Sequence, residues 1–172
     1  MGNKKNLLIL ILAICVVLCL CVTMWALFFR KEKPAQLVPD HAPPAESQAQ
    51  TIPNDTGEKL DNPENGGSIS LTYAKEVTID LSEGTVDLLF GNPGKSNMDM
   101  VLQLLIQDTV VSQSGTLEPG NQILTLNLAE GMAEKLSDGV YEGLFNILLY
   151  HPETGEKAIV NTEIPVTITV NP

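Results

Sequence analysis

The sequence predicts a mostly β protein, with one transmembrane α-helix near the N-terminus and an antiparallel β-sandwich at the C-terminal end. Residues 7–29 form an uninterrupted apolar run without a charge. Residues 68–172 instead alternate apolar and polar side chains in short segments that turn residues separate. Residues 30–67, which lie between these two parts, are rich in Pro and polar residues and predict a linker.

The apolar run at residues 7–29 is long enough to cross a bilayer as a helix. It contains no charge, Pro or Gly. At about 1.5 Å per residue it spans about 35 Å, against a hydrocarbon core of about 30 Å. A signal peptide has a shorter run and a small-residue cleavage site, and the residues at 26–30 offer no such site. We therefore predict a retained signal anchor that contacts the lipid bilayer through residues 7–29, with cleavage or lipidation as the alternative.

The orientation of this anchor is predicted from the rest of the chain. Lys4 and Lys5 precede the run, and Arg30, Lys31 and Lys33 follow it, so the positive charges on the two sides nearly balance. The long C-terminal part is acidic and lacks Cys. We therefore predict a cytoplasmic stub at residues 1–6 and a C-terminal domain on the extracytoplasmic side of the cell membrane.

Residues 30–67 are predicted to be a disordered, acidic tether. Six of the eleven prolines lie here, and the apolar residues show no period. Such a composition buries too little apolar surface to offset the loss of chain entropy. The expected role of the tether is to hold the domain away from the bilayer.

Residues 68–172 read as a series of short strands. Strands are expected at 68–73, 76–81, 85–90, 99–107, 109–113, 122–128, 140–150 and 157–170, with turns at 91–94, 118–120 and 151–155. Alternation in the sixth strand places Leu124, Leu126 and Leu128 on one face, and Pro165 is expected to kink the last strand. Residues 129–136 are expected to form a short helix or a crossing loop. The absence of a βαβ rhythm favours an antiparallel sandwich.

Three short motifs occur in a characteristic order. They are Asn92–Gly94, Leu117–Gly120 and Leu136–Tyr141. In this order they resemble the immunoglobulin-like sandwiches of bacterial surface proteins, of the fibronectin type III and cell-adhesion-related families. The resemblance covers about residues 85–170, and it implies that Tyr141 is a tyrosine corner with a buried ring and a hydroxyl bonded to nearby backbone. The chain departs from the family in having no Cys pair and no core Trp in this region.

No catalytic constellation is found, so we predict no enzyme activity and assign no catalytic, cofactor-binding or metal-binding residue. The histidines, His41 and His151, have no second His or Cys near them in sequence. Gly91–Ser96 resembles a phosphate-binding loop only superficially, because Leu89 stands where that motif requires Gly. Ser112 and Ser114 lie in no nucleophile elbow.

Two weaker chemical hypotheses remain. Asp80, Glu83 and Asp87 surround a turn and carry oxygen ligands that suit Ca²⁺, with solvated turn carboxylates as the alternative. Lys75 and Asn161 are the candidates, by position, for a Lys–Asn isopeptide cross-link, which rests on the analogy with surface sandwiches alone.

Net charge narrows the possible partners. Residues 68–172 carry four Lys and fourteen Asp and Glu, so 4 − 14 = −10. This charge repels nucleic acid, and we predict no nucleic-acid partner. The predicted function is a membrane-anchored interaction module for binding, adhesion or assembly, with an unidentified protein partner. The alternative is a structural accessory subunit of a larger envelope or secretion complex, which contacts its partners through the membrane helix face of Cys15 and Cys19.

Overall fold

The computed structural model describes residue 16 and residues 38–61 and 67–172, and the chain divides into two compact units, Met1–Ala35 and Gln36–Pro172. The described part of the second unit contains no helix, and none of the described residues belongs to a helix that is long and apolar enough to span a membrane. The predicted stub at residues 1–6 and almost all of the predicted span at residues 7–29 lie outside the described residues.

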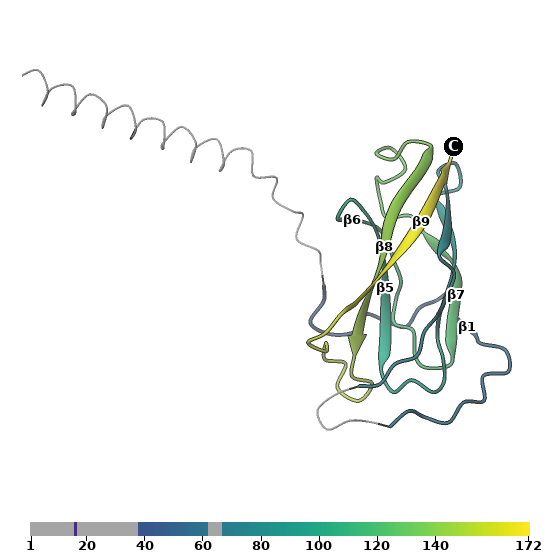
Figure 1. The fold of residues 1–172 in the computed structure, drawn as a ribbon, viewed down its shortest axis with the longest axis vertical. Coiled ribbons are helices and arrows are strands. Elements are labelled where there is room, and N and C mark those ends of the chain that lie inside the picture. Colours follow the sequence, from purple (N-terminus) through teal and green to yellow (C-terminus); the bar gives the residue numbers. More distant parts are fainter. Residues whose placement is uncertain (1–15, 17–37, 62–66) are drawn as a thin grey trace, which may run out of the picture. The chain divides into compact units, whose positions relative to one another are not determined.

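The described part of the second unit is a β domain, which confirms the mostly β prediction (Figure 1). Its strands are β1 (Gln50–Thr51), β2 (Thr72–Tyr73), β3 (Glu76–Asp80), β4 (Thr85–Asn92), β5 (Asp99–Ile106), β6 (Thr109–Gln113), β7 (Asn121–Asn127), β8 (Gly139–Tyr150) and β9 (Thr162–Asn171). The first predicted strand, at 68–73, is therefore reduced to two residues. Residues 129–136 form a series of turns, which agrees with the crossing-loop alternative.

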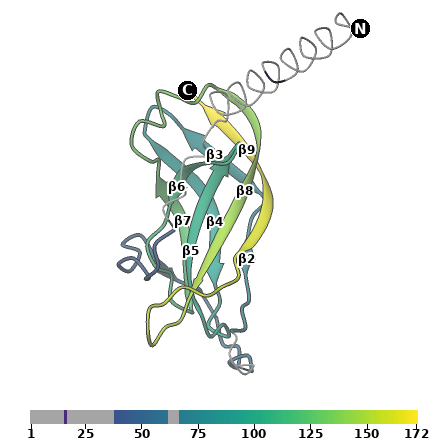
Figure 2. The ribbon, with the colours of Figure 1, turned by 90° about the vertical axis from the view of Figure 1, so that its left-hand side faces the viewer.

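The strands form one curled sheet in the order β1-β7-β4-β3-β9-β8-β5-β6, with β2 paired to β4 (Figure 2). All neighbours are antiparallel except β3 and β9, which are parallel from Glu76↔Thr167 to Asp80↔Asn171. The prediction of a purely antiparallel arrangement is therefore wrong for this one pair. Alternation shows which face of a strand is buried, but it carries no information about the direction of the neighbouring strand.

The two halves of the curled sheet face each other across one apolar core. Phe90 on β4 meets Phe145 on β8 edge-to-face, with ring centroids 6.0 Å apart. Every residue of β5 is buried, as expected of the most apolar strand.

On β9 the residues Ile164, Val166, Ile168 and Val170 point inward without interruption, so Pro165 does not break the alternation. Pro165 is tolerated because the ladder with β3 begins only at Thr167, and β9 has no neighbour on that side before it.

The sixth strand has a different phase from the predicted one. Ile123 and Leu126 are buried, whereas Leu124 is 40% exposed. The pairing of β4 with β7 shifts register between Asp87 and Phe90, where β4 has one residue more than β7. This bulge inverts the facing of the preceding part of β7, so the prediction that Leu124 lies on the same face as Leu126 is wrong.

Residues 38–61, here called the strap, were predicted as part of the disordered tether, and the structure contradicts this. Ala42 N donates to Gly155 O at 2.8 Å, and Glu46 N donates to Thr116 O at 2.9 Å. Further along, β1 extends the edge of β7, and Lys59 Nζ donates to Ser96 O at 2.8 Å. The strap therefore runs around one end of the domain, fixed at both ends and in its middle.

The prolines of the strap explain why composition misleads here. Proline cannot donate a backbone hydrogen bond, but its carbonyl still accepts one. The carbonyl of Pro39 accepts from Tyr150 Oη at 2.9 Å, that of Pro43 from Thr116 Oγ1 at 2.6 Å, and that of Pro44 from Thr116 N at 2.9 Å. Proline-rich sequence is compatible with this order because the domain supplies the donors.

Gly143 on β8 gives a test of the packing. A Cβ atom at this position would lie 2.2 Å from Ile168 Cδ1 and 2.7 Å from the backbone oxygen of Leu105. We expect Gly143→Ala to lower the free energy of unfolding of the domain by about 2 kcal/mol, because the Leu105 backbone cannot move away cheaply. Urea unfolding of residues 38–172 measures this difference.

Ile168→Val is the matched control for this test. Alone it should cost about 1 kcal/mol. Combined with Gly143→Ala it should cost less than the sum of the single changes, because Val lacks the Cδ1 atom that the new methyl group would meet. A Gly143→Ala domain as stable as the wild type would contradict the packing described here.

Candidate functional site

The outer face of β8 is apolar along most of its length, but only one end of it is covered. The outward residues Leu148 and Tyr150 on β8, together with Val101 on β5, are fully buried, and Val38 and Ala42 of the strap pack against them. At the other end of the same face, Val140 is 72% exposed. The strap therefore covers the half of the face next to the β8–β9 connection and leaves the other half open.

A row of side-chain amides crosses the outer face between these two halves. Asn146 Nδ2 donates to Gln103 Oε1 at 2.8 Å, and Gln103 Nε2 donates to Gln113 Oε1 at 2.8 Å. The row joins β8, β5 and β6, and both Gln103 and Asn146 are buried. Buried amides that are bonded in a chain fix the relative positions of the strands that carry them.

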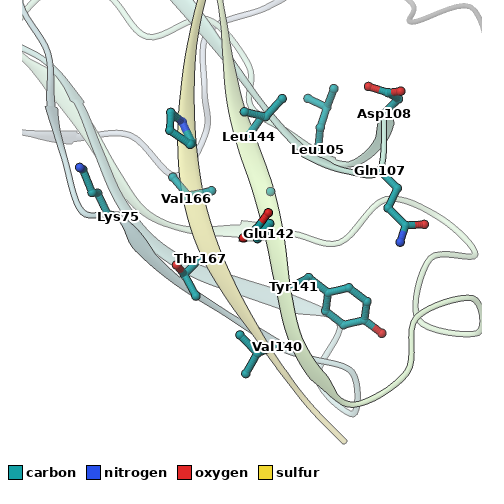
Figure 3. Close-up of a pocket in the computed structure, with 12 residues that line it drawn as sticks. Lys75, Leu105, Gln107, Asp108, Val140, Tyr141, Glu142, Leu144, Val166 and Thr167 are labelled. Atoms are coloured by element: carbon teal, nitrogen blue, oxygen red, sulfur yellow. The ribbon is translucent and has the colours of Figure 1, made fainter.

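A groove of about 810 Å³ lies on the open half, and we call it the β8 groove (Figure 3). Its residues come from the segment before β3, the β5–β6 turn, β8 and β9. They are Lys75, Leu105, Gln107, Asp108, Val140, Tyr141, Glu142, Gly143, Leu144, Pro165, Val166 and Thr167. Leu105 and Val166 are buried, Leu144 is half-buried, and Lys75 and Glu142 are exposed. An apolar surface with a few charged groups around it is the usual composition of a binding site.

The β5–β6 turn at the edge of the groove has an unusual backbone. Gln107 and Asp108 have φ values of 49° and 65°, so both residues of this two-residue hairpin loop are left-handed. A hairpin of this kind usually has Asn and Gly at these positions, because other side chains adopt positive φ at a cost. Neither residue is the Gly whose presence would have predicted this conformation from the sequence.

Tyr141 stands at the same end of β8. Its hydroxyl donates to the backbone oxygen of Ser137 at 2.9 Å, which confirms the predicted bond to nearby backbone. The ring packs against the core but is only half-buried, so the prediction of a fully buried ring is wrong. The bond connects the end of the segment before β8 to the first residues of β8, at the edge of the groove.

The acidic residues considered for Ca²⁺ do not form a ligand group. In the described residues, no group of three or more His, Cys, Asp or Glu side chains is arranged to hold a metal ion. Asp80 Oδ1 instead accepts from Ser82 Oγ at 2.7 Å and from Glu83 N at 2.9 Å, and these bonds hold the pKa of Asp80 below its usual value. Asp87 Oδ1 accepts from Thr125 Oγ1 at 3.2 Å on the neighbouring strand.

The serines and the turn considered in the sequence analysis make hydrogen bonds that support the fold. Ser112 Oγ donates to Asn127 O at 2.8 Å, and Ser114 Oγ accepts from Leu102 N at 2.9 Å, so both hydroxyls support strand connections. Residues 93–96 form a turn, in which Ser96 N donates to Pro93 O at 2.9 Å, after β4 has ended at Asn92.

The proposed Lys75–Asn161 cross-link is excluded by the register of β9. Lys75 O accepts from Thr167 N at 2.8 Å. Asn161 lies six residues before Thr167 along the same strand direction, which is about 20 Å at 3.3 Å per residue. A bond between these two side chains needs direct contact.

Sequence reasoning did not identify the groove itself. The available signal was in the segment 139–150, where Leu144 and Leu148 are in phase with each other and out of phase with Phe145, Ile147 and Leu149. A strand that is apolar on both faces needs cover on both, and the sequence does not show which half of the second face the strap would reach.

Asp99 is a buried carboxyl group at the start of β5, on the strap side of the domain. Among the residues that the structure describes, its Oδ1 atom has no hydrogen-bond partner. Burial raises the pKa of Asp99, and the nearby Glu118 raises it further, while Lys59 of the strap acts in the opposite direction. The ionised form of Asp99 is therefore disfavoured in the folded protein.

Comparisons with known proteins place the chain in no family. No protein family and no curated protein matches it. Among solved structures, it is similar to AggA, the major subunit of aggregative adherence fimbriae type I from Escherichia coli, with 12% identity, a TM-score of 0.31, and coverage of 67% of this chain and 100% of that one. It is also similar to the CooA pilin subunit from enterotoxigenic Escherichia coli, with 15% identity, a TM-score of 0.24, and coverage of 61% and 99%. At TM-scores this low, the two similarities carry no argument about function.

The electrostatics of Asp99 predict a pH-dependent gain of stability. We expect Asp99→Asn to raise the free energy of unfolding at pH 7, because it removes a carboxylate that the folded state disfavours. The gain should shrink as the pH falls through the raised pKa of the folded state, and it should vanish below about 3.9, the ordinary pKa of Asp, where the wild-type carboxyl group is protonated in both states. Urea unfolding of residues 38–172 at several pH values measures this.

The exposed Asp138 supplies the control. Asp138→Asn should leave the unfolding midpoint unchanged at each pH. A gain from Asp99→Asn that stayed constant between pH 7 and pH 4 would argue against an electrostatic cause.

Proposed function

We propose that the protein is a membrane-anchored, extracytoplasmic interaction module without catalytic activity, and that a protein partner binds in the β8 groove. The observation that supports the site is the unequal cover of one sheet face. The strap buries Leu148 and Tyr150, while Val140 and Leu144 on the same face have no such cover from the described residues. The anchor and the orientation rest on the apolar run at residues 7–29 and on the acidic, Cys-free C-terminal part.

The proposal includes an immunoglobulin-like assignment for the domain. One half of the sheet has the order β7-β4-β3, and the other has the order β9-β8-β5-β6. These orders correspond to the two sheets of an immunoglobulin-like sandwich, in which the strand equivalent to β8 carries the tyrosine corner. Tyr141 at the start of β8, with its bond to Ser137 O, supports this correspondence.

The chemistry of the groove indicates the kind of partner segment. Leu105 and Leu144 offer an apolar floor, and Glu142 is an exposed carboxylate on β8. The domain as a whole carries a charge of −10, from four Lys and fourteen acidic residues. A segment that combines apolar side chains with Lys or Arg complements both features, and long-range attraction to the acidic domain would speed its association.

The groove as an interaction site predicts a position-dependent cross-link. A photoreactive amino acid at Val140 should form a discrete cross-linked species in intact cells, because Val140 lies in the groove and is exposed. The same amino acid at Leu124, which is exposed on β7 and lies outside the groove, is the matched control. Gel electrophoresis followed by mass spectrometry detects the product and names the partner.

Two outcomes of this experiment would reject the groove as the site. One is the same product from both positions, and the other is a product from neither. In a second variant, Leu144→Glu should abolish the Val140 product while the protein remains folded. If a cross-link depended on the membrane segment instead, and was lost when residues 7–29 were exchanged for an unrelated span, the accessory-subunit alternative would be favoured.

The orientation can be tested separately with a single cysteine. The three natural cysteines are Cys15, Cys19 and Cys21, and none of them lies in the described residues. With those three replaced by Ser, Leu124→Cys, which is exposed and lies outside the groove, should react with a membrane-impermeant maleimide in intact cells as fully as in lysed cells. Labelling that requires lysis would place the domain in the cytoplasm and contradict the proposal.

A further inference from the structure

The connection between β8 and β9, residues 151–161, carries an exposed apolar pair, Ile159–Val160, shortly before β9, and we call this pair the tip. Ile159 is fully exposed and the adjacent Val160 is 67% exposed. The residues from Ala158 to Thr162 carry no charge, and Lys157 and Glu163 flank them. Single exposed apolar residues are common on protein surfaces, whereas here two β-branched side chains are exposed next to each other.

This loop lies beside the first described residues of the strap (Figure 1). Ala42 N donates to Gly155 O at 2.8 Å, Lys157 N donates to Asp40 O at 3.0 Å, and His41 forms an antiparallel bridge with Glu156. The loop therefore sits where the chain that follows the predicted anchor joins the domain.

The length of chain between the predicted anchor and the strap sets a limit on distance. The predicted span ends at Phe29 and the strap begins at Val38, so eight residues lie between them. Even a fully extended chain of this length reaches only about 30 Å. The ordered strap therefore leaves a much shorter linker than a tether of residues 30–67 would provide. If residues 7–29 are the anchor, the loop that bonds to the start of the strap is within reach of the bilayer.

From these observations we propose that Ile159 and Val160 insert into the interfacial region of the lipid bilayer. The proposal rests on the anchor and orientation given under the proposed function. The contact is apolar and independent of anionic lipid, because the tip is uncharged and the domain carries a charge of −10. Two side chains bind a bilayer weakly, but the anchor holds them at a high effective concentration beside the surface, so a weak contact suffices.

The contact would orient the domain. β8 has its Tyr150 end at the loop and its Gly139 end at the β8 groove. Twelve residues of strand span about 40 Å. With the loop in the interface, the β8 groove points away from the bilayer and is open to a partner.

A tryptophan reporter in the full chain tests this inference. Trp25 is the only tryptophan, and Trp25→Phe removes its signal. In that background Val160→Trp is placed in proteoliposomes of phosphatidylcholine with and without brominated chains. We expect a blue-shifted emission that the brominated lipid quenches, to the same extent when anionic lipid is added and at high salt.

Two controls separate the contact from the properties of tryptophan itself. Val140→Trp is equally exposed but lies at the other end of β8, and it should be neither shifted nor quenched. Adding Ile159→Asp to Val160→Trp should reduce the quenching to the level of Val140→Trp. Both positions are exposed, so these changes are not expected to unfold the domain.

The remaining outcomes overturn the inference in distinguishable ways. Protein that floats with the vesicles while the Val160→Trp signal is unquenched overturns the loop contact alone and leaves the anchor intact. Protein that does not float overturns the anchor, and the loop contact with it. Quenching that appears only with anionic lipid overturns the apolar contact. An unquenched tip that cross-links to a protein in cells shows that a protein covers it instead.

Discussion

The fold depends on β5, a strand whose side chains are apolar on both faces. Met100, Leu102 and Leu104 point into the core between the two halves of the sheet. Val101, Gln103 and Leu105 point the other way, and all three are buried as well. A strand of this kind is stable only when both of its faces are removed from water. The opposite half of the curled sheet covers the first face, and a second cover is needed for the other.

The strap is that second cover, and its position explains the distribution of functional surface. It packs on Val101, Leu148 and Tyr150 and then leaves the face to run towards Thr116 and the edge of β7. Beyond the row of Gln103 and Asn146 the face continues without it. The apolar surface near Val140 is thus the part of a two-sided sheet that the strap does not reach. The same strap takes up chain that was predicted to separate the domain from the predicted anchor.

The elements that the sequence predicts well are those in which one residue type decides the local structure. Strands β3 and β9 alternate regularly, the run in β5 is continuous, and the turn at Glu118–Gly120 contains the Pro and Gly that its geometry requires. Tyr141 was predicted with its correct hydrogen-bond type, because the motif places it two residues after the Gly that opens β8.

The parts that sequence reasoning missed depend on contacts between distant residues. Leu124 faces outward because β4, not β7, carries an extra residue. The strap is ordered because Tyr150, Thr116 and Gly155 lie where its backbone can bond to them, and none of these partners is near it in sequence. The groove was missed for the same reason, since only the path of the strap distinguishes Leu144 from Leu148.

The buried polar side chains show why the described domain offers surfaces to a partner more than chemical groups. Asn92 Nδ2 donates to Met98 O and to Leu117 O, both at 2.9 Å, and Thr116 Oγ1 donates to Pro43 O. These groups hold loops and the strap in place, and each is engaged with backbone. The most exposed apolar side chains of the described domain are Val140 in the groove and Ile159 and Val160 at the tip. Because a strand paired on both sides is stiff, β8 keeps these two surfaces at a fixed separation. A contact at one end therefore determines where the other end is presented.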